Sequence, residues 1–169
     1  MIDQPRYAEW VLLSHRVNRF EPFMVVTVQG LGQLDAKLAA EDAAFMASRA
    51  RGDDDLQRSL DQTERFTRSY LWVLGAYELI RSIAQKCRYN PSLVGAQVAS
   101  SIADAKTYFE RIRVPLAKYE PARKFSATDS TVAFPAIDPT KGSAWIVGKG
   151  TVISREDLAV CLREVLSAL

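Results

Sequence analysis

The fold is decided by residues 70–83, YLWVLGAYELIRSI. This stretch is apolar on most sides of a helix, and such a helix lies at the centre of a bundle or against a second copy of the chain. The surrounding segment 53–88 continues the helical spacing, with Leu56, Leu60, Phe66, Tyr70, Leu74, Tyr77, Ile80 and Ala84 on its expected buried stripe. We therefore predict a long central helix with Leu74 in the core, and we expect a homodimer.

Towards the N-terminus, apolar residues recur at steps of three and four, which is typical of helix. They are Trp10, Leu13, Val17, Phe20, Met24, Val28, Leu31, Leu34 and Leu38. Residues 23–28 are also rich in β-branched side chains and resemble a strand. The longer helical pattern favours helix, and Pro22 should kink it or start a second helix. That helix should continue to about residue 50.

Towards the C-terminus, Asn90-Pro91-Ser92 has the composition of a helix start. The helix that follows places Val94, Val98, Ile102, Ala105, Phe109, Ile112 and Leu116 on one stripe. Phe109 is an expected core residue. Pro115 lacks a backbone N–H, so it should bend this helix or end its regular part.

The periodicity changes after residue 124. Short β-branched runs at 131–134, 144–147 and 151–153 are separated by turn residues, which predicts a small antiparallel hairpin or meander. Ser154 followed by Asp157 resembles a capping box before a final helix. The fold class is therefore mainly α, a bundle of three to four long helices with a small C-terminal β-hairpin or meander and a final helix. We treat residues 1–169 as one domain, with the bundle in 1–124 and the hairpin and last helix in 125–169.

The composition is that of an ordinary globular domain, with 48% hydrophobic and 25% charged residues and a formal net charge of +2. Nucleic-acid binding would therefore need a local basic patch. Cys87 and Cys161 lie in apolar helical contexts and are expected to be reduced. The first residues do not resemble a signal peptide and no apolar run is long enough for a membrane span, so we expect a cytoplasmic protein.

Several kinds of site are disfavoured. His15 is the single histidine, which removes most His-based catalysis and His-rich metal sites. Asp53, Asp54 and Asp55 fit a helix N-terminus better than a cation site. We expect no metal and no cofactor.

The densest basic and aromatic stretch is residues 108–125. Its cations are the candidate binding residues, Arg111, Arg113, Lys118, Arg123 and Lys124. Lysine and arginine near a helix end also satisfy carbonyl groups and the helix dipole, so a solvated helix end is the alternative interpretation. As a binding site, the stretch would contact phosphates and stack on bases of single-stranded RNA.

Arg113, four residues and Lys118 resemble the Arg-x4-His element of the HEPN superfamily. That superfamily comprises small helical bundles of prokaryotic defence and toxin–antitoxin systems, many of which are dimeric ribonucleases. The resemblance covers about residues 53–124 and implies Glu78 as a polar residue facing the site. Lys118 stands where the family has His, and a lysine with a pKa near ~10.4 is a poor general base unless burial lowers that value.

These observations predict a non-catalytic helical interaction module that resembles an inactive HEPN-like protein. A protein partner is expected, and single-stranded RNA or a nucleotide is a further candidate. One alternative is a metal-independent ribonuclease that uses Arg113, Lys118 and Glu78. The other is a nucleotide-binding sensor with Trp72 and Tyr77 near a pocket.

Overall fold

A computed structural model describes residues 2–50 and 56–169. The helices are α1 (Gln4–Ser14), α2 (Met24–Ala50), α3 (Leu56–Tyr89), α4 (Ala96–Lys118) and α5 (Arg155–Ala168), with short 3-10 turns at His15–Arg19, Pro91–Leu93 and Arg123–Phe125. The strands are β1 (Asp129–Asp138), β2 (Gly142–Gly148) and β3 (Thr151–Ser154), in one antiparallel sheet of order β1-β2-β3. The predicted fold class, a helical bundle with a small C-terminal sheet and a final helix, is confirmed.

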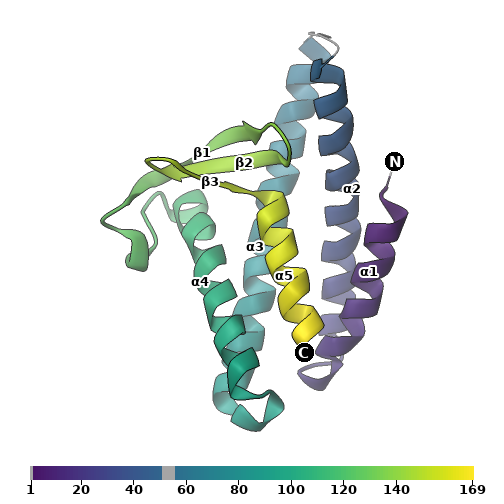
Figure 1. The fold of residues 1–169 in the computed structure, drawn as a ribbon, viewed down its shortest axis with the longest axis vertical. Helices are drawn as coiled ribbons and strands as arrows, with labels where there is room; N and C mark the ends of the chain where they lie inside the picture. The colour runs from purple at the N-terminus through teal and green to yellow at the C-terminus, as the bar shows by residue number, and fades with distance from the viewer. Residues whose placement is uncertain (1, 51–55) are drawn as a thin grey trace.

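Helices α2 and α3 form a long antiparallel pair, with α1 along α2 and α4 along α3 (Figure 1). Helix α5 returns along α4, and the sheet lies across the ends of α4 and α5 (Figure 1). The core therefore joins all five of these helices to the inner face of the sheet. Residues 24–28 are helical, as the longer periodicity predicted, and α2 begins directly after the turn residues Pro22 and Phe23.

The apolar stretch 70–83 is buried by the bundle itself. Trp72, Val73, Ala76, Ile80 and Ile83 are inaccessible to solvent. The observation that suggested a homodimer is thus explained within one chain, and the homodimer stays a prediction. Among the described residues, no helix is long and apolar enough to cross a membrane.

Three details of the helical prediction are wrong. Leu60 is 57% exposed and Leu74 is only half-buried, so α3 presents part of its predicted buried stripe to solvent. Helix α4 starts at Ala96, after the extended residue Gly95, whereas Pro91–Leu93 forms a separate 3-10 turn. The predicted core residue Phe109 is fully buried. The expected role of the aspartates at 53–55 lies outside the described residues.

The expectation that Pro115 ends the regular part of α4 is wrong, and the alternative, a bend at Pro115, stays a prediction. The helix continues through this buried proline to Lys118. It ends because Tyr119 adopts the left-handed conformation, with φ of 57°. The predicted capping box is confirmed, since the Ser154 hydroxyl accepts from the Asp157 N–H and the Asp157 carboxylate accepts from the Ser154 N–H.

Candidate docking surface

Three apolar side chains form a row across the outer face of the sheet. Phe134 lies opposite Ile146, and Ile146 lies opposite Val152, so one residue of each strand projects from the same face. They are 53%, 41% and 48% exposed, respectively. Single exposed apolar residues are common on protein surfaces, but a contiguous patch marks an interaction site. We call these three residues the outer row.

The next row of the sheet is buried on β2 and β3, whereas its member on the edge strand β1, Pro135, is exposed. Pro135 lies opposite Trp145, and Trp145 lies opposite Ile153. Trp145 and Ile153 are each 2% exposed and belong to the hydrophobic core. Because strand residues alternate between faces, burial of Trp145 and Ile153 against the helices places their neighbours Ile146 and Val152 on the solvent side.

A buried set of ions attaches the sheet to the bundle at β2. The Asp42 carboxylate of α2 accepts from the N–H and the hydroxyl of Ser143, at 3.2 and 2.9 Å. It also accepts from Arg155 Nη2 at 3.2 Å and lies 3.0 Å from Arg65 Nε. Gly142 allows this approach, because its φ is +82° and an added Cβ would lie 2.4 Å from Asp42 Cγ.

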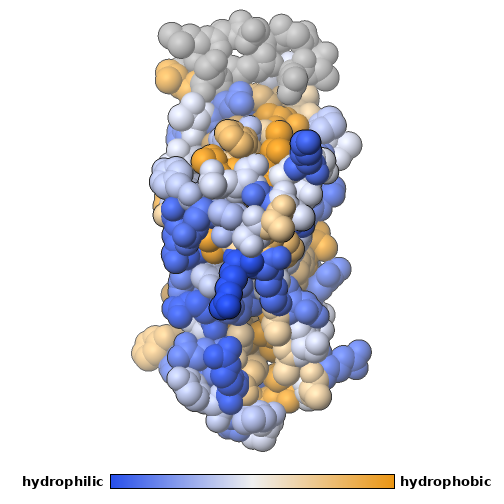
Figure 2. Space-filling model, turned by 90° about the vertical axis from the view of Figure 1, so that its left-hand side faces the viewer, coloured by the Kyte–Doolittle hydropathy of each residue, from blue (hydrophilic) through white to orange (hydrophobic). Residues whose placement is uncertain are grey.

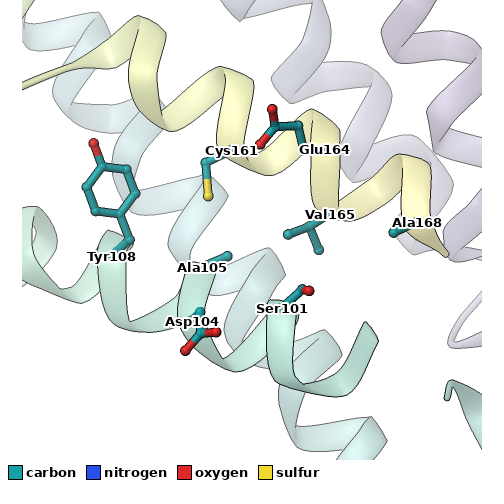
Figure 3. Close-up of a pocket in the computed structure, with 8 residues that line it drawn as sticks. All are labelled: Ser101, Asp104, Ala105, Tyr108, Cys161, Glu164, Val165 and Ala168. Carbon is teal, nitrogen blue, oxygen red and sulfur yellow. The ribbon is translucent and has the colours of Figure 1, made fainter. Parts of the chain in front are cut away.

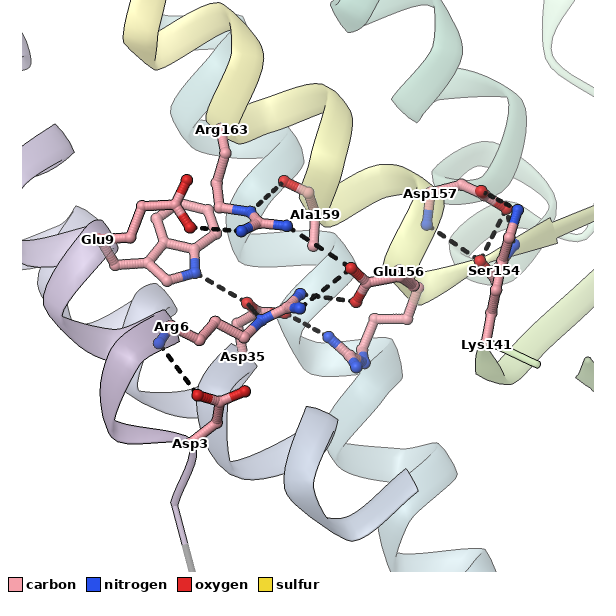
Figure 4. Close-up of polar contacts among 12 residues, drawn as sticks. Asp3, Arg6, Glu9, Asp35, Lys141, Ser154, Glu156, Asp157, Ala159 and Arg163 are labelled. Atoms are coloured by element: carbon pink, nitrogen blue, oxygen red, sulfur yellow. Dashed lines mark hydrogen bonds and ion pairs between the residues drawn. The ribbon is translucent and has the colours of Figure 1, made fainter. Parts of the chain in front are cut away.

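A second carboxylate, Asp35, extends the set towards α1. It accepts from Trp10 Nε1 at 2.8 Å and from Arg6 Nε at 2.5 Å, and it also accepts from Arg155 Nη1. Arg6 in turn donates to Glu156 (Figure 4). Arg155 and Asp35 are wholly buried, so this is an internal support of the fold and its charges are not open to a partner.

Of the predicted binding residues, Arg111 is engaged within the chain. Its guanidinium donates to both carboxylate oxygens of Asp129, at 2.7 and 2.8 Å, and lies 4.4 Å from the ring centre of Phe125. Hydrogen bonding from Arg111 lowers the pKa of Asp129, and the same bonds raise the pKa of Arg111. Arg111 therefore joins α4 to the start of β1.

The three residues of the ribonuclease hypothesis are only partly brought together. Arg113 Nη2 lies 4.0 Å from Glu78 Oε1, and its guanidinium lies over the Tyr77 ring. Lys118 is exposed and its ammonium lies 3.7 Å from Glu120 Oε1. The burial that would make Lys118 a general base is therefore absent.

The remaining predicted cations, Arg123 and Lys124, lie in the exposed turn before β1. This turn is near the start of β3, because Arg111 contacts Phe125, Asp129 and Thr151. Lys149, in the β2–β3 turn, is also exposed. Lys124 donates to Thr107, and within the described part of the chain none of these three cations forms an ion pair with a carboxylate. We call Arg123, Lys124 and Lys149 the basic end of the sheet.

Figure 2 faces the side of the molecule that bears α4 and the turns at this end of the sheet, and most of its surface is hydrophilic. Hydrophobic residues show between the hydrophilic ones. This side of the molecule is thus mostly polar, with apolar residues interspersed.

The sensor hypothesis placed Trp72 and Tyr77 beside a pocket, but both side chains belong to the core. Trp72 packs near Phe109 and donates from Nε1 to the Leu31 carbonyl at 3.0 Å. The Tyr77 hydroxyl lies 3.1 Å from Glu110 Oε1. Across the ranges that the structure describes, no group of three or more His, Cys, Asp or Glu side chains is placed to hold a metal ion.

Sequence reasoning missed both the outer row and the buried ions. A signal for the ions was present, because Val28, Asp35 and Asp42 recur every seven residues and so share one face of α2. All three are buried. The outer row had no such signal, since the pairing of the strands was needed to align its three residues.

Comparisons with family models, with curated proteins and with solved structures found no match to this chain.

Proposed function

We propose that this protein is a non-catalytic interaction module that binds an acidic, amphipathic segment of a protein partner across the outer face of its sheet. The observation that carries the proposal is the outer row, Phe134, Ile146 and Val152, exposed in register on three neighbouring strands. The row places one aromatic side chain beside two aliphatic ones, and aromatic residues are enriched in the centre of protein interfaces.

The size of the face favours one segment over a second copy of the chain. The seven residues of β2 span about 23 Å, and three strands add about 10 Å across the sheet. The area of this face, its length times its width, is therefore a few hundred Å². This area is well below the roughly 800 Å² that each partner buries in a standard stable interface. A helix of about 15 residues has the length of this face, at 1.5 Å per residue.

The charge at the basic end of the sheet indicates the chemistry of the segment. Among the residues that the structure describes, Arg123, Lys124 and Lys149 form no ion pair with a carboxylate, so we take their charges to be open to carboxylates of a partner. Rim charges of this kind raise the association rate and select the partner more than they raise affinity. An acidic flank beside an apolar stripe matches both features of the surface.

Single-stranded RNA is the competing ligand for the same cations. The outer row offers one aromatic ring, Phe134, whereas binding of successive bases uses several stacked rings. Cleavage has less support, because Lys118 is exposed and paired with Glu120. These features favour a protein ligand.

The test uses a fluorescent 16-residue helical peptide with leucine along one face and glutamate on both flanks. The comparison peptide keeps the leucine face and carries lysine on the flanks. We expect the acidic peptide to bind with a Kd of about 10–100 μM and the basic peptide at least about tenfold more weakly.

The double variant Lys124→Glu/Lys149→Glu should lose the preference for the acidic peptide. Lys37→Glu, on the exposed side of α2, should keep this preference. Equal binding of the two peptides, or no saturable binding of the acidic one, refutes the proposal. Tighter binding of a labelled single-stranded RNA that persists in Phe134→Ser assigns the cations to nucleic acid instead.

A further inference from the structure

A groove lies between α4 and α5, away from the outer row. Its volume is about 390 Å³, at the lower end of the range for small-molecule sites. The lining residues are Ser101, Asp104, Ala105 and Tyr108 from α4, and Cys161, Glu164, Val165 and Ala168 from α5 (Figure 3). Each helix contributes positions i, i+3, i+4 and i+7, which share one face.

Small side chains create the space. Helices usually approach until side chains from both fill the gap between them. Here Ser101 and Ala105 on α4 lie across from Val165 and Ala168 on α5, and three of these four side chains are among the smallest available (Figure 3). The floor is apolar, and it is continuous with the core through Ala105 and Val165.

The charge in the groove is entirely negative. Asp104 and Glu164 stand on the two helices, and neither has an ion-pair partner among the residues that the structure describes. Burial raises the pKa of Cys161 to about 11 and that of Tyr108 to about 12, so both groups are neutral at pH 7. The Cys161 thiol points towards α4, and as a protonated thiol it is an apolar lining group (Figure 3).

We propose that this groove binds a small organic cation, an ammonium group attached to an apolar body. Asp104 and Glu164 attract the ammonium group, and the Tyr108 ring offers a face for a cation–π contact. Ala105, Val165 and Ala168 accept the apolar body. The residues that line the groove include two carboxylates and no cation, so the charge of the lining disfavours an anionic ligand.

An organic cation fits this site better than a metal ion does. Divalent metals need several oxygen, nitrogen or sulfur ligands that converge on one point. Two carboxylates on separate helices do not meet that need, and the described residues contain no metal-binding group of three. An extended apolar floor between the carboxylates suits a ligand with its own apolar surface.

The test is a calorimetric titration of the full chain with 2-phenylethylamine, 2-phenylethanol and 3-phenylpropionate. These probes share one body and carry a positive, no and a negative charge. We expect saturable binding of the amine only, with an affinity that falls as salt is added. Equal binding of the three probes, or no saturable binding of the amine below about 10 mM, overturns the proposal.

Variants locate the binding. Asp104→Asn and Glu164→Gln should each weaken amine binding about fivefold, and the double variant about 25-fold, since separate surface charges contribute nearly additively. Both positions are exposed, so these variants should fold, and circular dichroism checks this. Glu120→Gln, an exposed carboxylate outside the groove, is the matched control and should change nothing.

Ala168→Phe tests the same site by filling it, without any change of charge. It should abolish amine binding, whereas Phe134→Ser in the outer row should leave it intact. Amine binding that survives the double variant or Ala168→Phe places the ligand elsewhere and overturns the proposal. Because Phe134→Ser separates the two surfaces, failure of this site is distinguishable from failure of the docking surface.

Discussion

The buried ion set gives the sharpest prediction about stability, through Arg155→Met. Arg155 is fully buried and bridges Asp35 and Asp42, which are also buried. A methionine side chain fills much of the volume of the Arg155 side chain but carries no charge, so both carboxylates lose one neighbouring cation. Removing one side of a buried ion pair costs about 3–5 kcal/mol because the remaining charge is uncompensated.

The surroundings of the two carboxylates set the magnitude within that range. Asp35 keeps Arg6 and Trp10, and Asp42 keeps Arg65 and Ser143. Because each carboxylate retains one nearby cation and one residue that donates a hydrogen bond, we expect a loss near the lower limit, about 3 kcal/mol. Such a loss is a large part of the stability of an ordinary domain.

Urea denaturation followed by circular dichroism measures this loss. Arg81→Met is the matched control, because Arg81 is exposed and pairs with Glu78 three residues away on the same helix. It should cost at most about 0.5 kcal/mol. Adding Asp42→Asn to Arg155→Met should cost less than the sum of the two single changes. A loss below about 1 kcal/mol for Arg155→Met refutes the view that these ions hold the sheet to the bundle.

Three further predictions concern the core, the turns and pH. Phe109→Ala should lower the free energy of unfolding by about 3–5 kcal/mol, because Phe109 is fully buried. Leu74→Ala should lower it by about half as much, because Leu74 is only half-buried. Chemical denaturation of both variants measures the two losses. Gly142→Ala should lower the free energy of unfolding by more than about 2 kcal/mol, because the added Cβ would meet the buried carboxylate of Asp42. Gly150→Ala should lower it by about 1 kcal/mol, because Gly150 has a φ of +72° but open space around it. Thermal unfolding of the two variants measures the difference. Asp129 has a depressed pKa in the folded state, so its ion pair should stabilise the protein fully above pH ~4 and progressively less as the pH falls through the folded value. The stability difference between the native protein and Asp129→Asn should therefore be larger at pH 7 than at pH 3, and equal differences would contradict the assignment.

Periodicity was sufficient to predict the helices and their order. The apolar spacing from Trp10 to Leu38 correctly outweighed the β-branched run at 23–28, because it predicts helix on both sides of Pro22. The structure divides this stretch between two helices, α1 and α2. Boundaries were harder to predict. Asn90-Pro91-Ser92 has the composition of a helix start, yet the extended backbone at Gly95 delays α4 to Ala96.

The candidate site was less accessible from sequence than the fold. Residues 108–125 were correctly identified as a basic stretch, but their spacing could not show that Asp129 engages Arg111, or that Lys124 shares one end of the sheet with Lys149. These relations depend on the tertiary pairing of segments that are far apart in the chain. For the same reason, the outer row and the α4–α5 groove have no motif in the sequence.

Methyl-resolved NMR during titration with the acidic amphipathic peptide tests the central proposal most directly. The methyl groups of Ile146 and Val152 should show the largest shifts, those of the buried Ile153 should shift much less, and Phe134→Ser should weaken binding at least about tenfold. Contradiction would come from largest shifts on α4 and α5, or from unchanged affinity in Phe134→Ser.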